Sequence, residues 1–492
     1  MMKKLLTLTL LLSVTATGFC TQKKGKLPKL AAKSSIVTDY IDSNFDTYNK
    51  LQKEIWDYSE VGFQEEKSSK ALKDHLRQNG FTLTEGIAGE PTAFIAEYGS
   101  GRPIIGLTAE FDALPGLSQD TVPYRKERYE NKPGHGCGHN LFGTAAAAAG
   151  IAIAKWLKET GTQGTIRVYG SPAEEGGSGK TYIVRDGFYK DVDLVLDWHP
   201  AGQNAVNTTP GLAKVGIDYI FHGKSAHAAG QPWAGRSALD GLLLFCHAVD
   251  MMREHIKPHN RLHYVIHNGG EAPNVVPDYA RAEFYARSPN TKELRQIVEW
   301  YDSAAVGAAK ATQTTVEKRF IGGQYEYFIN GTIARQLQKN LEYVGGVKWN
   351  ERERAFAEAL NKVNGNPDSL LNTVERVKPL GEIKRQSDGG GSTDVADISW
   401  NVPTAGFGTV TTVPGNPGHS WQNAATVGTT IGTKGLINAA KVIALTGIDF
   451  FASPKLVKEA QEEFKRERPA DFKYEHLGGD VPPALDYRKG LN

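Results

Sequence analysis

Four short segments of the chain carry side chains that bind transition metals. They span 133–140 (Pro-Gly-His-Gly-Cys-Gly-His-Asn), 171–177 (Ser-Pro-Ala-Glu-Glu-Gly-Gly), 197–200 (Asp-Trp-His-Pro) and 415–420 (Gly-Asn-Pro-Gly-His-Ser). Their candidate ligands and acid–base groups are Cys137, His139, Glu174, Glu175, His199 and His419. A thiol, three imidazoles and two carboxylates suit a two-metal hydrolytic centre better than a structural site for a single ion.

Each of these side chains also has an ordinary structural interpretation. Cys137 and His139 could simply be buried residues beside a helix-capping loop, and Glu174 and Glu175 could be a solvated surface pair. His199 and His419 could be hydrogen-bonded loop residues. Side chains two apart in an extended segment point the same way, so Cys137 and His139 can reach one ion. Glu174 and Glu175 follow a buried strand, where one carboxylate can bind metal while the other carries protons.

Other kinds of chemistry have no motif in this chain. There is no Gly-x-Ser-x-Gly elbow, no phosphate-binding Walker loop, and no dinucleotide fingerprint between a strand and a helix. The 57 Lys and Arg nearly balance the 55 Asp and Glu. With no basic stripe interleaved with aromatics, we expect no nucleic-acid partner.

The segments that must position the ligands alternate between strand and helix patterns. Buried strands are predicted at 103–108, 165–169 and 194–196, and an alanine-rich helix at 141–159. This alternation is typical of an α/β domain with a largely parallel sheet, which gathers its ligands at the carboxyl ends of the strands. The glycine-rich segment 387–392 is expected to line the substrate pocket.

A different pattern interrupts this domain. Strands are predicted at 213–222, 279–287 and 314–319, with helices at 237–254 and 291–310, which indicates a compact α+β insert. The expected domains are a catalytic domain in two parts (36–211 and 326–450), an inserted domain (212–325) and a peripheral C-terminal extension (451–492). A length of 492 residues also favours more than one domain.

The N-terminus has the pattern of a secretory signal, assigned to residues 1–20. An apolar run at 5–19 follows Lys3 and Lys4 and is too short to span a bilayer stably, so we expect a secreted or periplasmic protein without a membrane span. Cys20 closes the segment and is a candidate lipid anchor. Plain cleavage near 16–18 is the alternative, because Phe19 replaces the small residue that normally precedes a lipidated cysteine. Cys246 lies in an apolar helical pattern, so no disulfide is expected.

A set of ordered motifs resembles a known family. The sequences AEFDALPG, GHGCGHN, PAEEGG, DWHP, GKSAHA, NVVPDYA and GHSWQ occur in that order within residues 40–446. This order resembles the M20 family of metallopeptidases, in its amidohydrolase branch, and is most similar to the group of p-aminobenzoyl-glutamate hydrolase B subunits. The resemblance implies a di-metal catalytic domain that is interrupted by a lid, through which relatives form homodimers.

The resemblance assigns roles to individual residues of the catalytic domain. It implies that the metal ligands are Cys137, His139, Glu175, His199 and His419, with the Cys137 thiolate placed to touch both of two divalent ions. Glu174 becomes the general base, and Asp112 becomes a carboxylate that orients a ligand. Glu110 departs from the family pattern of histidine or aspartate, so its contact with metal stays open. Softness of the ligands favours zinc, whereas relatives often use manganese.

The resemblance also implies three functional residues in the lid. His227 matches a histidine that reaches the partner's active site in dimeric relatives and stabilises the oxyanion there. Asn274 and Arg287 match positions that polarise the carbonyl and grip a substrate carboxylate. Arg281 and Arg236 compete for the arginine role, and a surface ion pair is the alternative for Arg287.

These patterns predict an enzyme that hydrolyses a small-molecule amide. The leading hypothesis is a metal-dependent amidohydrolase of N-acyl or N-aroyl amino acids, including compounds like p-aminobenzoyl-glutamate. The alternatives are an M20-type dipeptidase for unusual dipeptides and a non-catalytic binding lipoprotein. A binding protein has no need of a free carboxylate such as Glu174 beside the metal-ligating one.

Overall fold

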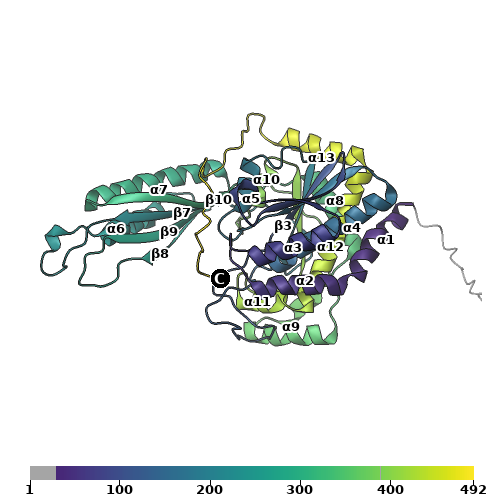
Figure 1. Ribbon diagram of the computed structural model, residues 1–492, viewed down its shortest axis with the longest axis horizontal. Helices are drawn as coiled ribbons and strands as arrows, with labels where there is room; N and C mark the ends of the chain where they lie inside the picture. The colour runs from purple at the N-terminus through teal and green to yellow at the C-terminus, as the bar shows by residue number, and fades with distance from the viewer. Residues whose placement is uncertain (1–28, 388) are drawn as a thin grey trace, which may run out of the picture.

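A computed structural model describes residues 29–387 and 389–492 of the chain. They form a wide α/β body from which a narrower arm extends (Figure 1). The predicted signal segment 1–20 and the candidate anchor Cys20 lie outside the described residues, so both stay predictions.

The body is built on a seven-stranded sheet in the order β1-β2-β4-β3-β5-β11-β6. Its four inner strands, β4, β3, β5 and β11, are parallel, and the outer strands pair antiparallel. The strands are β1 (Thr82–Glu85), β2 (Phe94–Ser100), β3 (Ile104–Ala109), β4 (Gly164–Gly170), β5 (Leu194–Ala201), β6 (Ala205–Val206) and β11 (Thr404–Val410). This confirms the predicted α/β class with a largely parallel central sheet.

Helices cover both faces of this sheet. Alternate residues of β5 feed different cores, because successive side chains of a strand point to opposite faces: Leu194, Leu196 and Trp198 face one cluster and Val195 the other. The helices of the body are α1 (Lys29–Ser43), α2 (Phe45–Tyr58), α3 (Glu66–Gln78), α4 (His139–Thr160), α5 (Gly179–Arg185), α8 (Gly331–Val344), α9 (Glu351–Asn364), α10 (Val395–Ser399), α11 (Trp421–Val427), α12 (Thr430–Ala452) and α13 (Pro454–Glu467), with short 3-10 turns at Ile87–Gly89 and Asp368–Thr373.

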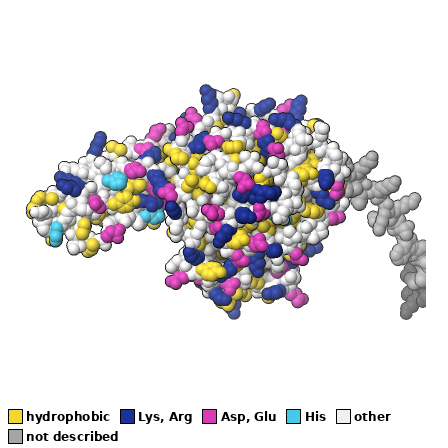
Figure 2. Space-filling model, viewed as in Figure 1, with side chains coloured by type: hydrophobic (Ala, Val, Ile, Leu, Met, Phe, Trp, Pro, Cys, Tyr) yellow, Lys and Arg dark blue, Asp and Glu magenta, His cyan; other side chains and the backbone are white. Residues whose placement is uncertain are grey.

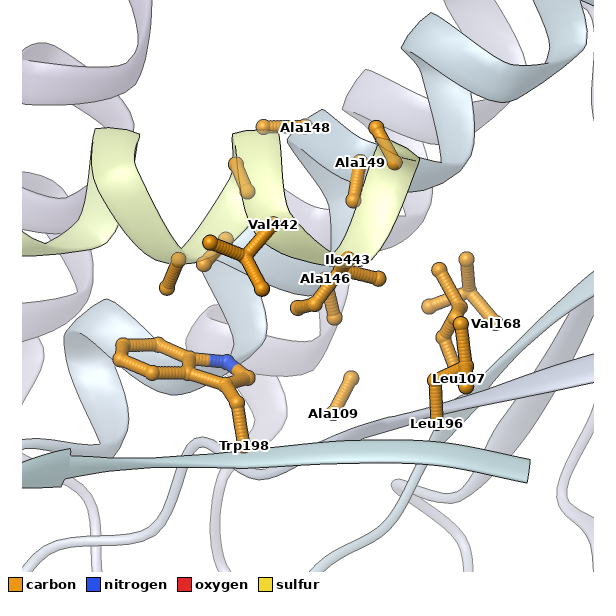
Figure 3. Packing of buried hydrophobic residues seen from close by; sticks show 14 of the residues in the cluster. Leu107, Ala109, Ala146, Ala148, Ala149, Val168, Leu196, Trp198, Val442 and Ile443 are labelled. Carbon is orange, nitrogen blue, oxygen red and sulfur yellow. The ribbon is translucent and has the colours of Figure 1, made fainter. Parts of the chain in front are cut away.

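The larger core lies where α4 and α12 pack on the parallel strands. Figure 3 shows alanines of α4 and Val442 and Ile443 of α12 above Leu107, Val168 and Trp198 of the sheet. The fully buried run 145–149 consists of alanines, whose small side chains let α4 approach the strands closely. By length and composition α4 and α12 could each cross a membrane, but both are largely buried inside the fold, as the core helices of soluble proteins are.

The arm is an α+β unit inserted between β6 and α8. Its antiparallel sheet has the order β10-β7-β9-β8, and its own aromatic core includes Tyr219, Phe245, Phe284 and Tyr301. Its elements are β7 (Ala213–His222), α6 (Ala238–Met252), β8 (Arg261–Asn268), β9 (Tyr279–Ser288), α7 (Thr291–Thr312) and β10 (Thr315–Gln324), with a 3-10 turn at Pro232–Ala234. The predicted α+β lid that interrupts the catalytic domain is thus confirmed.

Strand β8 was not predicted from the sequence. It is the edge strand of the arm sheet, and most of its residues are exposed or half-buried. Its sequence does carry a partial alternation, with Leu262, Tyr264 and Ile266 at alternate positions, so this strand was overlooked although a local signal was present. Figure 2 shows hydrophobic side chains between the charged ones along the arm, and those with exposed fractions above half include Trp233, Met251 and Val265.

The C-terminal segment is not peripheral, contrary to the prediction. After α13 the chain runs between the arm and the body and ends near α2 and α11 (Figure 1). Tyr474 Oη donates to Asp397 Oδ1 at 2.7 Å, Asp486 forms an ion pair with Arg319 of β10, and Arg488 lines the cavity described below. A charged, proline-containing segment offers no periodicity from which this course follows.

Candidate metal centre

The sequence-predicted ligands meet at one edge of the body sheet. Strands β3, β4 and β11 are followed by the loops that carry Glu110 and Asp112, Glu174 and Glu175, and His419, while His199 lies near the end of β5. The carboxyl ends of parallel strands share one edge, so these loops converge. They line a cavity of about 650 Å³.

Cys137 and His139 are placed by a turn at the start of α4. Gly138 has φ 89°, and a Cβ there would lie 3.0 Å from Cβ of Pro200. Only glycine therefore fits this left-handed turn comfortably. The side chains of Cys137 and His139 converge because the chain turns into the helix between them. The predicted closeness of the two side chains is therefore present, but the predicted extended segment is not.

Two groups of possible metal ligands share Cys137. In one, Cys137 lies with His139 and His199, and in the other it lies with Glu175 and His419; the ligand atoms within each group are all within 4.8 Å of one another. A thiol common to both groups is suited to bridge two ions. Oε1 of Glu175 is buried and has no hydrogen-bond partner, so a bound cation would satisfy this oxygen. The described residues thus fit a pair of divalent cations.

Hydrogen bonds fix the orientation of the histidine rings. Nδ1 of His199 lies 2.8 Å from the carbonyl oxygen of Pro200, so it carries the proton and leaves Nε2 free, 3.4 Å from Cys137 Sγ. Burial, and then the neighbouring His139, lower the pKa of His199 to about 3, so this ring is neutral, as a metal ligand must be.

Asp112 holds two parts of the site together. Its Oδ1 lies 2.8 Å from His139 Nδ1, and its Oδ2 accepts the backbone N–H of Glu175 at 3.0 Å. Burial favours a higher pKa for Asp112, but the adjacent His139 and the Glu175 N–H outweigh it and lower the pKa to about 2. The carboxylate is therefore ionised and orients both a candidate ligand and its loop.

Glu174 and Glu175 have different surroundings. Oε2 of Glu175 lies 3.5 Å from Nε2 of the exposed His419. Glu174 is buried and forms a third group with Glu110 and His139. Burial, followed by repulsion from Glu110 and Glu175, raises the pKa of Glu174 well above its usual range. A carboxylate whose charged form is destabilised in this way accepts a proton readily.

A buried lysine beneath the cavity was missed by sequence reasoning. Lys180 Nζ lies 2.7 Å from Glu110 Oε1 and 2.6 Å from Asp394 Oδ1, and all three side chains are inaccessible to solvent. The other oxygen of Glu110 lies 3.0 Å from His139 Nε2. Glu110 is therefore shared between a lysine and a candidate ligand. Lys180 lies in a short helix with no motif, so no spacing signal could have found it.

The predicted lid residues are not all brought to the cavity of this chain. His227 and Asn274 are exposed on the arm and do not line it. Arg287 does line it and donates from Nη1 to Ser392 Oγ at 2.9 Å. Arg281 instead pairs with Asp218, and Arg236 donates to Gln313. Of the three arginines, the geometry favours Arg287 as the one that can meet a substrate.

Two further cations line the same cavity and were not singled out from the sequence. Lys214 is the second residue of β7, and Arg488 comes from the C-terminal segment. Gly391, Ser392 and Thr393 also line the cavity, as expected for the glycine-rich loop.

Comparisons with known proteins agree with this geometry. A family model described as peptidase family M20/M25/M40 matches residues 106–444. The chain is 38% identical over 455 residues to the B subunit of the p-aminobenzoyl-glutamate hydrolase of Escherichia coli strain K12, a match that covers 87% of this chain and 94% of that protein.

Solved structures share the fold at lower sequence identity. The aminobenzoyl-glutamate utilization protein from Klebsiella pneumoniae superposes with a TM-score of 0.58 at 18% identity, covering 83% of this chain and 98% of that one. A Bacillus subtilis protein described as a dinuclear metal-binding peptidase of the M20 family gives a TM-score of 0.52 at 17% identity, with 84% and 99% covered.

Proposed function

The chain belongs to peptidase family M20/M25/M40, and from this premise we propose that it hydrolyses the amide bond between an aroyl or acyl group and an amino acid. It is a metal-dependent hydrolase of amide bonds. The observation that carries the proposal is Glu174, a buried carboxylate beside two groups of possible ligands that share Cys137.

We propose that two divalent cations, zinc or manganese, are held by Cys137, His139, Glu175, His199 and His419. When bound, such a pair supplies Lewis acidity to the amide carbonyl and makes water more acidic. The residues of the chain orient the ligands. Asp112 orients His139 through Nδ1 and the loop of Glu175 through its N–H, and the Pro200 carbonyl keeps the Nε2 of His199 free.

Glu174 moves the proton. Because its charged form is buried and repelled by two neighbouring carboxylates, it takes a proton from the attacking water as the carbon–oxygen bond forms. It then delivers that proton to the amide nitrogen as the carbon–nitrogen bond breaks. The products are a carboxylic acid and a free amino group, and Glu174 returns to its ionised form.

The proposed substrates are aryl amides of amino acids, with p-aminobenzoyl-glutamate as the first candidate. Its support is the name of the relative that is 38% identical over most of both chains. Arg287 lines the cavity, and a guanidinium suits a carboxylate because it donates two parallel hydrogen bonds.

The test compares p-aminobenzoyl-glutamate, benzoyl-glycine and β-alanyl-lysine, each with and without its terminal carboxylate. We expect cleavage of the aroyl amides, loss of activity with a chelator and recovery with added zinc or manganese. Free acids should exceed blocked ones by about ten- to a hundredfold, since charged hydrogen bonds contribute about 1.5–3 kcal/mol. Cleavage of the dipeptide alone would replace this proposal with the dipeptidase alternative.

We also propose that the working unit is a homodimer formed through the arm. More than half of the exposed large hydrophobic side chains of the described residues belong to the arm. They include Leu243, Leu244 and Met251 of α6 and Val265 and Ile266 of the edge strand β8. Burial of these side chains and pairing of the free edge favour association with a second copy. In such a dimer His227 and Asn274 would serve the neighbouring active site.

We further propose a secreted or periplasmic location, because an apolar run at 5–19 that follows Lys3 and Lys4 is typical of a secretory signal. Cys20 is a candidate lipid anchor, and plain cleavage near 16–18 is the alternative.

A further inference from the structure

The C-terminal tail, residues 480–492, is seated in a niche beside the metal centre. A Cβ on Gly62 would lie 2.3 Å from Tyr487 Oη, and a Cβ on Gly176 would lie 2.9 Å from Tyr487 Cε2. Two glycines from distant segments thus make room for one tyrosine of the tail. The Tyr487 ring also packs edge-on against Phe63, with centroids 5.8 Å apart. The tail is therefore built into the body and does not merely lie on its surface.

Hydrogen bonds hold the tail on both sides of Tyr487. Gln64 Nε2 donates to the Leu485 carbonyl at 2.9 Å, and Asn492 Oδ1 accepts the Val61 N–H at 2.7 Å. Asp486 pairs with Arg319 at the base of the arm. These contacts fix the backbone around Arg488 relative to both the body and the arm.

Arg488 lines the substrate cavity with a guanidinium that is only partly satisfied. Its Nη2 donates to the Glu175 carbonyl oxygen at 2.9 Å, and the guanidinium lies 5.0 Å from the centroid of the Tyr487 ring. Its Nη1 is buried and has no hydrogen-bond partner among the described residues. A buried, unpaired donor on a charged group is costly unless something completes it, and an anion is the natural partner.

Two further cations that line the same cavity, Lys214 and Arg287, come from the arm. Lys214 on β7 pairs directly with Arg287 on β9 in the register of the arm sheet. Like charges directly opposite each other destabilise a sheet. Lys214 is buried, with Nζ 4.7 Å from the centroid of the Tyr285 ring, and Arg287 donates to the neutral Ser392. No ion pair with a carboxylate is found for either residue within the described chain.

We propose that Arg488, supplied by the C-terminal tail, and Lys214 bind a second carboxylate on the amino-acid part of the substrate, while Arg287 binds the first. Carboxylates also line this cavity, but these three cations have no ion pair with any of them among the described residues. Three such cations match a dicarboxylic amino acid better than a neutral one. The inference rests on the proposed function and specifies its substrate class, an amide of glutamate or a related diacid. The tail then determines specificity.

The test compares p-aminobenzoyl-glutamate with p-aminobenzoyl-glutamine, which keeps the shape but loses the second charge. For the native chain we expect kcat/KM to favour glutamate by at least tenfold. Arg488→Met should lower this ratio at least tenfold, mainly through the KM for glutamate, and Arg488→Lys should restore part of it. Lys489→Met, at the exposed neighbouring position, is the matched control and should leave the ratio unchanged.

Three results would overturn the inference. They are a native ratio near one, a ratio that Arg488→Met leaves intact, and an equal loss on both substrates, which would mean that Arg488 only positions the Glu175 loop. Metal content and thermal unfolding check that each variant is folded. If the native chain cleaves neither amide, the proposed function fails. The second-carboxylate subsite is then tested alone, by comparing the thermal stabilisation that glutarate, a dicarboxylate, and butyrate, a monocarboxylate, give to the protein. Stronger stabilisation by glutarate that Arg488→Met abolishes supports the subsite, and equal stabilisation by both ligands rejects it.

Discussion

At the scale of single residues, the two adjacent glutamates differ through their surroundings. Oε1 of Glu175 is left without a partner near Cys137 and His419, whereas Glu174 is buried against Glu110 and His139. The first arrangement favours a ligand, and the second favours a proton carrier. Two residues of the same chemistry thus take different roles because the loop presents them to different neighbours.

This difference predicts opposite outcomes for two isosteric substitutions. Glu174→Gln should keep the bound metal and lose about 10²- to 10⁴-fold in kcat, because an amide cannot accept the proton of water. Glu175→Gln should lose metal, as measured by elemental analysis after dialysis. Equal metal content together with equal residual activity in the two variants would contradict the division of roles.

The residues that the sequence made predictable are those within local motifs. Glu174, Glu175 and His199 follow predicted strands, and Cys137 and His139 precede a predicted helix, so the topology brings these five together. His419 was found from its own Gly-Pro turn and from the resemblance. Lys180, Lys214 and Arg488 could not be identified this way. Arg488 meets the Glu175 carbonyl across 313 residues, and neither position carries a signal for the other.

At the scale of elements, the tail depends on glycines that leave space for it. Gly62→Ala would place Cβ 2.3 Å from Tyr487 Oη and 2.9 Å from the Ala173 backbone, so the tail must shift. We expect a loss of about 1–3 kcal/mol in unfolding free energy and a higher KM for glutamate amides. Adding Tyr487→Phe should relieve part of the clash.

A control for this prediction lies in α7. A Cβ on Gly307 meets nothing within 4 Å, so Gly307→Ala should be neutral or stabilise by about 0.4–1 kcal/mol. Thermal and urea unfolding of the variants measure both effects. If Gly62→Ala unfolded like the native chain, the tail would not be seated as described.

Asp397 joins three elements and predicts a pH dependence of stability. It accepts the Tyr325 N–H at 2.8 Å and the Tyr474 hydroxyl at 2.7 Å, which ties α10 to the end of β10 and to the C-terminal segment. Burial raises the pKa of Asp397 to about 8. In the unfolded chain a typical aspartate has a pKa of about 3.9.

The sign follows from which state holds the proton. Between about pH 4 and pH 8 the folded chain keeps Asp397 protonated while the unfolded chain releases the proton, so stability falls as pH rises, by up to about 1.4 kcal/mol per unit. Asp397→Asn should have a flatter profile in urea unfolding at pH 5, 6 and 7. The exposed Asp471→Asn serves as control. Identical slopes in Asp397→Asn and the native chain would reject this account.

At the scale of the whole molecule, the α/β body and the inserted arm were both predictable from the sequence. Buried parallel strands and an alanine-rich core helix have strong local patterns. The course of the C-terminal segment has no such pattern, because its place depends on contacts with distant elements. The edge strand β8 has a partial alternation at 262, 264 and 266 that was overlooked. His227 and Asn274 are exposed on the arm, and in the homodimer that we propose they serve the neighbouring active site.

That assembly leads to the last prediction. If His227 serves the partner's site, Glu174→Gln chains and His227→Ala chains are each inactive as homodimers. A mixed dimer has one site with both changes and one with neither, because the intact Glu174 of one chain meets the intact His227 of the other. Mixing the two variants should therefore restore activity, up to about half of the native rate per mixed dimer. Subunit exchange is verified with differently tagged chains, and exchange without any rescue would place His227 in its own chain's site or outside catalysis.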